Sequence, residues 1–99
     1  MSHFINLREA QAHTFRYQRS LIGSAQTHSV IFDAQMIDQL TAQDGVREIR
    51  IYMGEDEEGR FTFVLVGVDR DGNDLLPGLI LNQGKTSPPV PAGESPLNL

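Results

Sequence analysis

The segment Phe61–Val68, FTFVLVGV, most constrains how this chain can fold, because it is apolar on both sides of an extended strand. Successive side chains of a strand point to opposite faces of its sheet. Two apolar rows result, Phe61, Phe63 and Leu65 on one face and Val64, Val66 and Val68 on the other. Such a strand belongs in the middle of a sheet with both faces covered. Two short helices cover one face, so the other is either buried within the chain or left as an apolar patch that dimerises or binds a partner.

Strands are also predicted on either side of this segment. The alternation in VREIRIYM predicts a strand beginning near Val46, and the acidic loop GEDEEG joins it to RFTFVLVGV as a β-hairpin. After the turn DRDGND, the segment LLPGLIL at 75–81 predicts a third strand. Pro77 cannot donate a ladder hydrogen bond, so this strand is confined to an edge or begins with a bulge. The three strands predict an antiparallel meander.

Two helices are predicted before the sheet. Asn6 is a suitable N-cap for a helix over residues 7–20, and Asp33 for a second helix that Gly45 closes in a left-handed conformation. The stripe of the first helix expected to face the core consists of Leu7, Ala10, Thr14, Tyr17 and Leu21. Between the helices, HSVIF indicates a brief strand.

The length of 99 residues provides enough apolar surface for one core. We therefore predict a single α+β domain over residues 1–84, with two N-terminal helices followed by a three-stranded antiparallel β-meander. Residues 85–99 contain four of the five prolines and are predicted to form a loosely ordered, proline-rich tail.

Composition argues against several classes of function. The absence of cysteine excludes disulfides, thiolate nucleophiles and cysteine-ligated metals. A net charge of −5, with eight Lys and Arg residues, argues against nucleic-acid binding. No apolar run reaches the roughly 18 residues of a membrane span, and no signal peptide is evident, so we expect a cytoplasmic protein without a membrane segment.

No motif indicates a catalytic centre. The sequence contains no Gly-x-Ser-x-Gly, no phosphate-binding glycine loop and no histidine pair with zinc-ligand spacing. His28, Ser29 and Asp33 form the one clustered trio, and Asp33 is better explained as a helix cap. We predict no catalytic residue, no cofactor and no metal centre, and favour a non-catalytic protein over an enzyme.

Arg47, Arg50 and Tyr52 are candidate ligand or partner contacts. Arg50 and Tyr52 share one strand face, where they can present a guanidinium beside an aromatic ring to an anion. The alternative is that these side chains pair across the sheet or stack on Phe61 or Phe63.

The loop after the central strand offers a candidate cation site. Asp69, Asp71 and Asn73 have the alternate spacing of calcium-loop ligands, but position six is Asp74 instead of glycine and position twelve is Ile80 instead of glutamate. Asp and Asn next to glycine equally favour a tight turn. We expect a turn and keep cation binding as the alternative.

The segments LTAQDGVREIRIYMG, FVLVGVDRDGNDLL and SPP resemble a family of small uncharacterised bacterial proteins, over residues 32–89. The family pattern has an Arg-Ile-Tyr strand, a Val-Gly-Val-Asp strand end with Gly-Asn-Asp, and a tail with cysteines around Pro-Pro. Ser87 and Pro91 stand in place of those cysteines. The resemblance implies this architecture and no activity.

The function expected from the sequence is a non-catalytic protein-interaction module, with a second copy or an unidentified protein as its partner. The alternatives are a small enzyme or ligand-binding protein with a pocket near Arg50 and Tyr52, and a cation-binding protein that uses the loop Asp69–Asp74.

Overall fold

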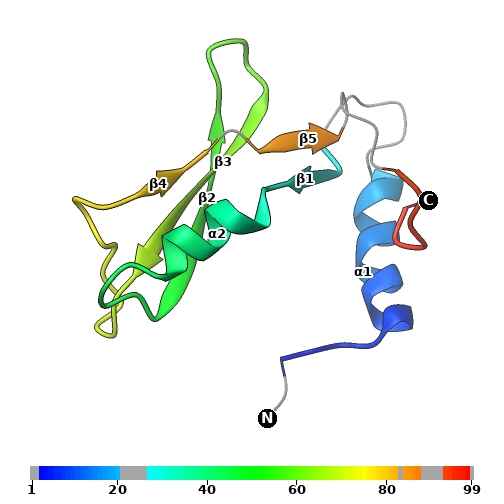
Figure 1. Ribbon diagram of the computed structural model, residues 1–99. Coiled ribbons are helices and arrows are strands. Elements are labelled where there is room, and N and C mark those ends of the chain that lie inside the picture. The colour runs from blue at the N-terminus through cyan, green and yellow to red at the C-terminus, as the bar shows by residue number, and fades with distance from the viewer. Residues whose placement is uncertain (1–2, 21–26, 83, 88–92, 99) are drawn as a thin grey trace. The chain divides into compact units, whose positions relative to one another are not determined.

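The computed structural model describes residues 3–20, 27–82, 84–87 and 93–98 (Figure 1). Its elements are α1 (Leu7–Ser20), β1 (Ser29–Ile31), α2 (Ala34–Thr41), β2 (Glu48–Glu55), β3 (Phe61–Val68), β4 (Ile80–Leu81) and β5 (Lys85–Ser87). The strands β2, β3 and β4 form an antiparallel sheet in that order, and β1 pairs with β5. The prediction of an α+β fold with a three-stranded antiparallel sheet is confirmed.

The chain divides into two compact units. The helical unit comprises Met1–Ser29 with Ser87–Leu99, and the sheet unit comprises Val30–Thr86. Strand β1 separates the two helices, and β5 lies within the segment expected to be a loose tail. The predicted boundary between residues 84 and 85 stays a prediction.

In the sheet unit, β2 and β3 form the predicted hairpin and β3 is the central strand. Ile51 lies opposite Leu65, and Tyr52 lies opposite Val64. Paired residues share a face of an antiparallel sheet, so the odd-numbered residues of β2, β3 and β4 form one face and the even-numbered residues the other. We call these the odd face and the even face.

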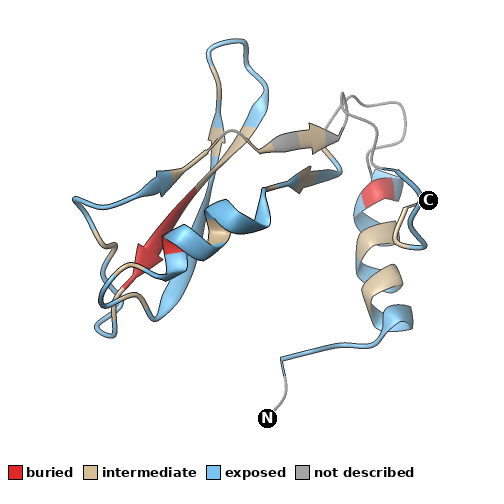
Figure 2. Cartoon of the chain, viewed as in Figure 1, coloured by how far each residue is buried: buried red, intermediate tan, exposed pale blue. Residues whose placement is uncertain are grey.

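The core of the sheet unit lies in the second half of β3, shown in red in Figure 2. The buried apolar side chains are Leu40 of α2 and Leu65, Val66 and Val68 of β3. On the odd face, Val46 packs over Gly67 so closely that a Cβ there would lie 2.6 Å from Val46 Cγ2. Because Leu65 and Val66 have opposite parity and are both buried, both faces of this half are covered within the chain.

The predicted third strand is only partly formed. Asp74 makes a single bridge to Val68, and the chain leaves the sheet before returning at β4. Between them lies the cis peptide bond Leu76–Pro77. Pro77 has no N–H to place in the ladder, and Leu79 N–H donates to Gln43 Oε1 at 2.8 Å instead of to a strand. The prediction of a strand over residues 75–81 is therefore correct only at the edge strand Ile80–Leu81.

Both helices begin at the predicted N-caps. Asn6 Oδ1 accepts from Glu9 N–H at 2.8 Å, and Asp33 Oδ1 accepts from Gln35 N–H at 2.8 Å. Gly45 has the expected positive φ of 87°, although α2 has already ended at Thr41. These caps satisfy N–H groups that have no partner within the helix.

The predicted core-facing stripe of α1 is only partly correct: Ala10 and Thr14 are partly buried, and two other members are not. Leu7 and Tyr17 are about half exposed, whereas Gln18 is 7% exposed, and Leu21 lies outside the described residues. Three polar side chains of α1 donate to backbone carbonyls near the C-terminus, namely Gln11 to Pro96 at 3.0 Å, Thr14 to Leu97 at 2.8 Å and Gln18 to Leu97 at 3.2 Å. Since the neighbouring segment presents carbonyl groups that need donors, the polar side of α1 faces it.

Candidate functional site

Arg50 and Tyr52 meet Asp74 on the even face of the sheet. Arg50 Nη1 donates to Asp74 Oδ1 at 2.5 Å, and Arg50 Nη2 donates to the carbonyl of Gly72 at 3.2 Å. The Tyr52 hydroxyl donates to the other oxygen of Asp74. We call Arg50, Tyr52 and Asp74 the Asp74 cluster. It fastens the loop after β3 to the edge strand β2.

The charges of this cluster compensate each other. The pKa of Arg50 is raised above its ordinary value, first by a hydrogen bond with the Tyr52 side chain and then by the negative charge of Asp74. The side chain of Asp74 is 19% exposed and that of Arg50 is 43% exposed. Two guanidinium nitrogens of Arg50 already donate within the chain, so an incoming anion would compete with Asp74 for them.

The other parts of this prediction have different outcomes. Arg47 is exposed just before β2 and takes no part in the cluster; its backbone N–H donates to Val68 O at 2.8 Å. Stacking of Arg50 or Tyr52 on Phe61 or Phe63 is wrong, because both phenylalanines lie on the odd face. Arg50 and Tyr52 do pair across the sheet, and the residue that both contact is Asp74. Asp74 was not among the partners expected from the sequence.

The loop that contains Asp69, Asp71 and Asn73 is a tight turn. Asp69 Oδ1 accepts from Asp71 N–H at 2.9 Å and from Asn73 N–H at 3.0 Å, and Gly72 has a φ of 84°. Gly72 N–H donates to Asp69 O, and Asp69 N–H donates to Asn73 O. One carboxylate oxygen of Asp69 is therefore occupied by the backbone of its own loop, as expected for a turn. Cation binding by these residues stays a prediction.

The hairpin turn between β2 and β3 has the same construction. Asp56 Oδ1 accepts from Glu58 N–H and Arg60 N–H, both at 2.9 Å, and Gly59 has a φ of 79°. The two loops share the pattern Asp-x-x-Gly-x, a three-residue turn with glycine in the left-handed conformation. The repeat of this pattern at 56–60 and 69–73 was the signal in the sequence that could have identified both loops as turns.

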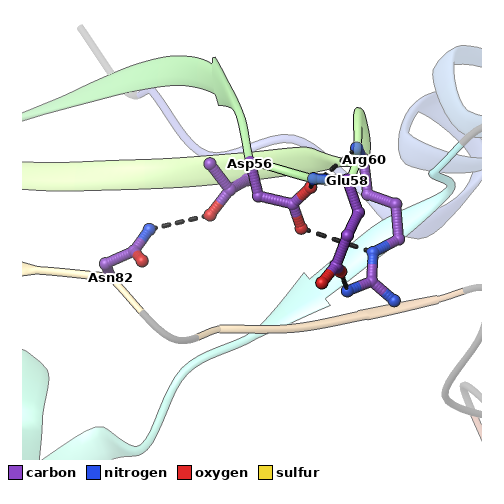
Figure 3. A network of polar contacts seen from close by, with 5 residues as sticks. Asp56, Glu58, Arg60 and Asn82 are labelled. Atoms are coloured by element: carbon purple, nitrogen blue, oxygen red, sulfur yellow. Dashed lines mark hydrogen bonds and ion pairs between the residues drawn. The ribbon is translucent and has the colours of Figure 1, made fainter.

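An acidic depression lies beside the hairpin turn. Its volume is about 420 Å³, and it is lined by Glu55, Asp56, Glu57, Glu58, Thr62, Val64 and Asn82. Figure 3 shows how its acidic groups are held: Arg60 pairs with Asp56 and Glu58. Asn82 Nδ2 donates to Thr62 Oγ1 at 2.7 Å. The pKa of Asp56 is lowered, first by the hydrogen bond from Arg60 N–H. Neither Arg50 nor Tyr52 lines this depression.

The outer edge of β2 carries a row of exposed apolar side chains. In the sheets of the described chain, β2 pairs only with β3. Ile49, Ile51 and Met53 are 36%, 59% and 77% exposed, and all three lie on the odd face. We call them the β2 row. The opposite edge of the sheet is formed by β4, which has two residues.

Two further features were sought in the described residues: a metal-ligand group and a helix that could span a membrane. Over residues 3–20, 27–82, 84–87 and 93–98, no three His, Cys, Asp or Glu side chains are grouped to hold a metal ion. Within the same residues, neither helix combines the length and the apolar character needed to cross a bilayer.

Comparisons of the chain with protein-family models, with curated proteins and with solved structures found no match. The resemblance to a small bacterial family therefore stays a prediction.

Proposed function

We propose that this protein is a non-catalytic protein-interaction module whose contact surface is the outer edge of β2 together with the β2 row. The observation that carries the proposal is an eight-residue edge strand with three large apolar side chains exposed at alternate positions. An edge strand presents unpaired N–H and C=O groups to a partner strand, and apolar side chains beside them add affinity.

The contrast between the two edges of the sheet supports this proposal. Strand β4 has only two residues and follows Pro77, two features that protect a sheet edge from pairing with another strand. Strand β2 has neither feature, because it is long and contains no proline. Two of its three charged residues, Glu48 and Glu55, stand at the ends of the strand, and the third, Arg50, is paired with Asp74. The middle of β2 is thus the part of the sheet best suited to accept another strand.

The ligand-binding alternative near Arg50 and Tyr52 has less support. The guanidinium and the hydroxyl group both donate to Asp74, which occupies the place that a bound anion would take. The described depression in the sheet unit lies elsewhere and is lined by acidic residues, which would repel an anion. An interaction surface on β2 requires no rearrangement of these groups.

A photo-crosslinking side chain tests the proposed surface. It is introduced at position 53 by replacing Met53, which is 77% exposed, and in a control protein at position 80 by replacing Ile80, which is 58% exposed on the other edge strand. Irradiation is carried out on the purified protein and in the cells that produce it natively. We expect position 53 to form crosslinks to a second polypeptide chain, and position 80 to form few.

Mass spectrometry of the crosslinked peptides then decides the outcome. Crosslinks from position 53 that end on a second polypeptide support the interaction module. Crosslinks that end only within the same chain, or equal intermolecular yields at positions 53 and 80, would overturn it, because the β2 edge would then be covered internally or have no preference for partners.

A further inference from the structure

The direction of the backbone groups in β2 follows from the hairpin turn. Asp56 N–H donates to Arg60 O at 2.8 Å, which makes residues 56 and 60 a hydrogen-bonded pair of the β2–β3 ladder. Such pairs recur at every second residue of an antiparallel ladder. The even-numbered residues of β2 therefore bond to β3, and the N–H and C=O groups of Ile49, Ile51 and Met53 point to the outer edge.

A second copy of β2 can pair with this edge about a two-fold axis perpendicular to the sheet. The axis must lie midway between one β2 residue and the same residue of the other copy, so that paired residues have the same parity and lie on the same face. The three central registers place Arg50, Ile51 or Tyr52 opposite itself. These registers differ in which side chains become neighbours.

The two outer registers bring unfavourable neighbours together. With Arg50 at the axis, two guanidinium groups lie side by side. With Tyr52 at the axis, Ile49 lies opposite Glu55 of the other copy, and Glu48 lies opposite Asp56. Like charges directly opposite each other destabilise a strand pair, and a carboxylate beside an apolar side chain leaves both without a suitable partner.

The register centred on Ile51 makes complementary pairs over the middle of the strand, from Ile49 to Met53. Ile51 meets Ile51 of the second copy, and Ile49 meets Met53, so the two β2 rows form one apolar patch. Arg50 meets Tyr52 across the axis in a pair without backbone hydrogen bonds, where side chains approach most closely. Glu48 meets Gly54 at each end, so this register sets no like charges opposite each other.

We infer that two copies of this chain join their β2 strands antiparallel in the register centred on Ile51, so that the two sheets become one continuous six-stranded sheet. This inference rests on the proposed function and names the partner as a second copy of the chain. It gives a role to Arg50 and Tyr52 together, as residues whose neighbours across the axis select one register. The Asp74 cluster holds Arg50 and Tyr52 in position for that contact.

The first test measures mass by light scattering over a range of protein concentrations. We expect a rise from 11.0 kDa toward twice that mass for the wild-type chain. Ile51→Lys places two ammonium groups at the axis and should abolish the rise. Ile80→Lys is the matched control, because Ile80 is equally exposed at 58% and lies on the other edge; it should dimerise like the wild type. Circular dichroism confirms that both variants are folded.

The second test determines the register with a pair of opposite charges. Ile49→Lys and Met53→Glu each place one charge beside an apolar side chain of the other copy, and each should raise the dissociation constant at least threefold. The double variant sets opposite charges against each other only in the register centred on Ile51 and should recover most of the affinity. Ile49 and Met53 are four residues apart on one strand, about 13 Å at 3.3 Å per residue, so no contact within one chain can produce this recovery.

The outcomes separate this inference from the proposed function. A concentration-independent mass of 11.0 kDa overturns the homodimer; if position 53 still crosslinks to a different protein, the interaction module stands. A dimer that Ile51→Lys leaves intact, or one in which the double charge variant shows no recovery, overturns the register centred on Ile51.

Discussion

Replacing Gly67 by alanine tests how tightly the segment after α2 closes the odd face of the sheet. A Cβ at this position would lie 2.6 Å from Val46 Cγ2 and 3.3 Å from Cγ1, well inside the ordinary carbon contact of about 3.5–4.0 Å. Strand β3 is paired on both sides, and Leu75 N–H donates to Gly67 O at 2.8 Å, so Val46 has to move instead of the strand.

The size of the effect can be estimated from two opposing contributions. Overpacking of this kind costs about 1–3 kcal/mol. Alanine loses less conformational entropy than glycine in a strand, which returns about 0.5–1 kcal/mol. Taking the middle of each range, we expect Gly67→Ala to lower the free energy of unfolding by about 1 kcal/mol. In a Val46→Ala background, both methyl groups that cause the clash are gone, and the same substitution should be neutral or stabilising.

Urea unfolding followed by far-UV circular dichroism measures all four proteins of this cycle, provided that the slopes of the transitions agree. Equal destabilisation by Gly67→Ala in both backgrounds would refute the reasoning, because the loss would then come from a source other than Val46. An unchanged stability in the wild-type background would refute the close packing itself.

Three further predictions concern the N-cap of α2, the hairpin turn and the loop that contains Asp69. Asp33→Ala should lower the free energy of unfolding by about 1 kcal/mol, seen in urea unfolding, because α2 loses its N-cap, while Asp33→Asn should lose little. The pKa of Asp56 is depressed, mainly by the hydrogen bond from Arg60 N–H. The Asp56 carboxylate therefore contributes its full stabilisation at pH values above the ordinary pKa of aspartate, and this stabilisation is lost as pH falls through the depressed pKa. NMR of the hairpin amides should show this acid-induced loosening, and Asp56→Asn should remove it. Calcium should leave the melting temperature unchanged, because Asp69 Oδ1 already accepts two loop amides; a rise that Asp71→Asn abolishes would contradict this.

The parts of the fold that could be predicted from the sequence are those set by neighbours along the chain. The caps at Asn6 and Asp33 and the left-handed glycine at position 45 were recognisable because each needs only residues within one or two turns. The β2–β3 hairpin was recognisable for the same reason, since a short polar loop joins two extended runs.

The candidate site was predicted only in part. Arg50 and Tyr52 could be placed on one face from their spacing. Their joint acceptor, Asp74, could not be identified, because it is more than twenty residues away and reaches them only through the bridge between Asp74 and Val68. The break of the third strand near Pro77 had the same cause, since whether a segment rejoins a sheet depends on partners elsewhere in the fold.

Sequence alone determined the local elements of this protein: two capped helices, a hairpin with a doubly apolar central strand, and two aspartate turns. Tertiary structure decided what those elements face. It buried the second half of β3 on both sides, turned the polar side of α1 toward residues 96–98 and left the β2 row exposed. The physical reason is that a turn or a cap is stabilised by adjacent residues, whereas burial is a sum over neighbours that lie far apart in the chain.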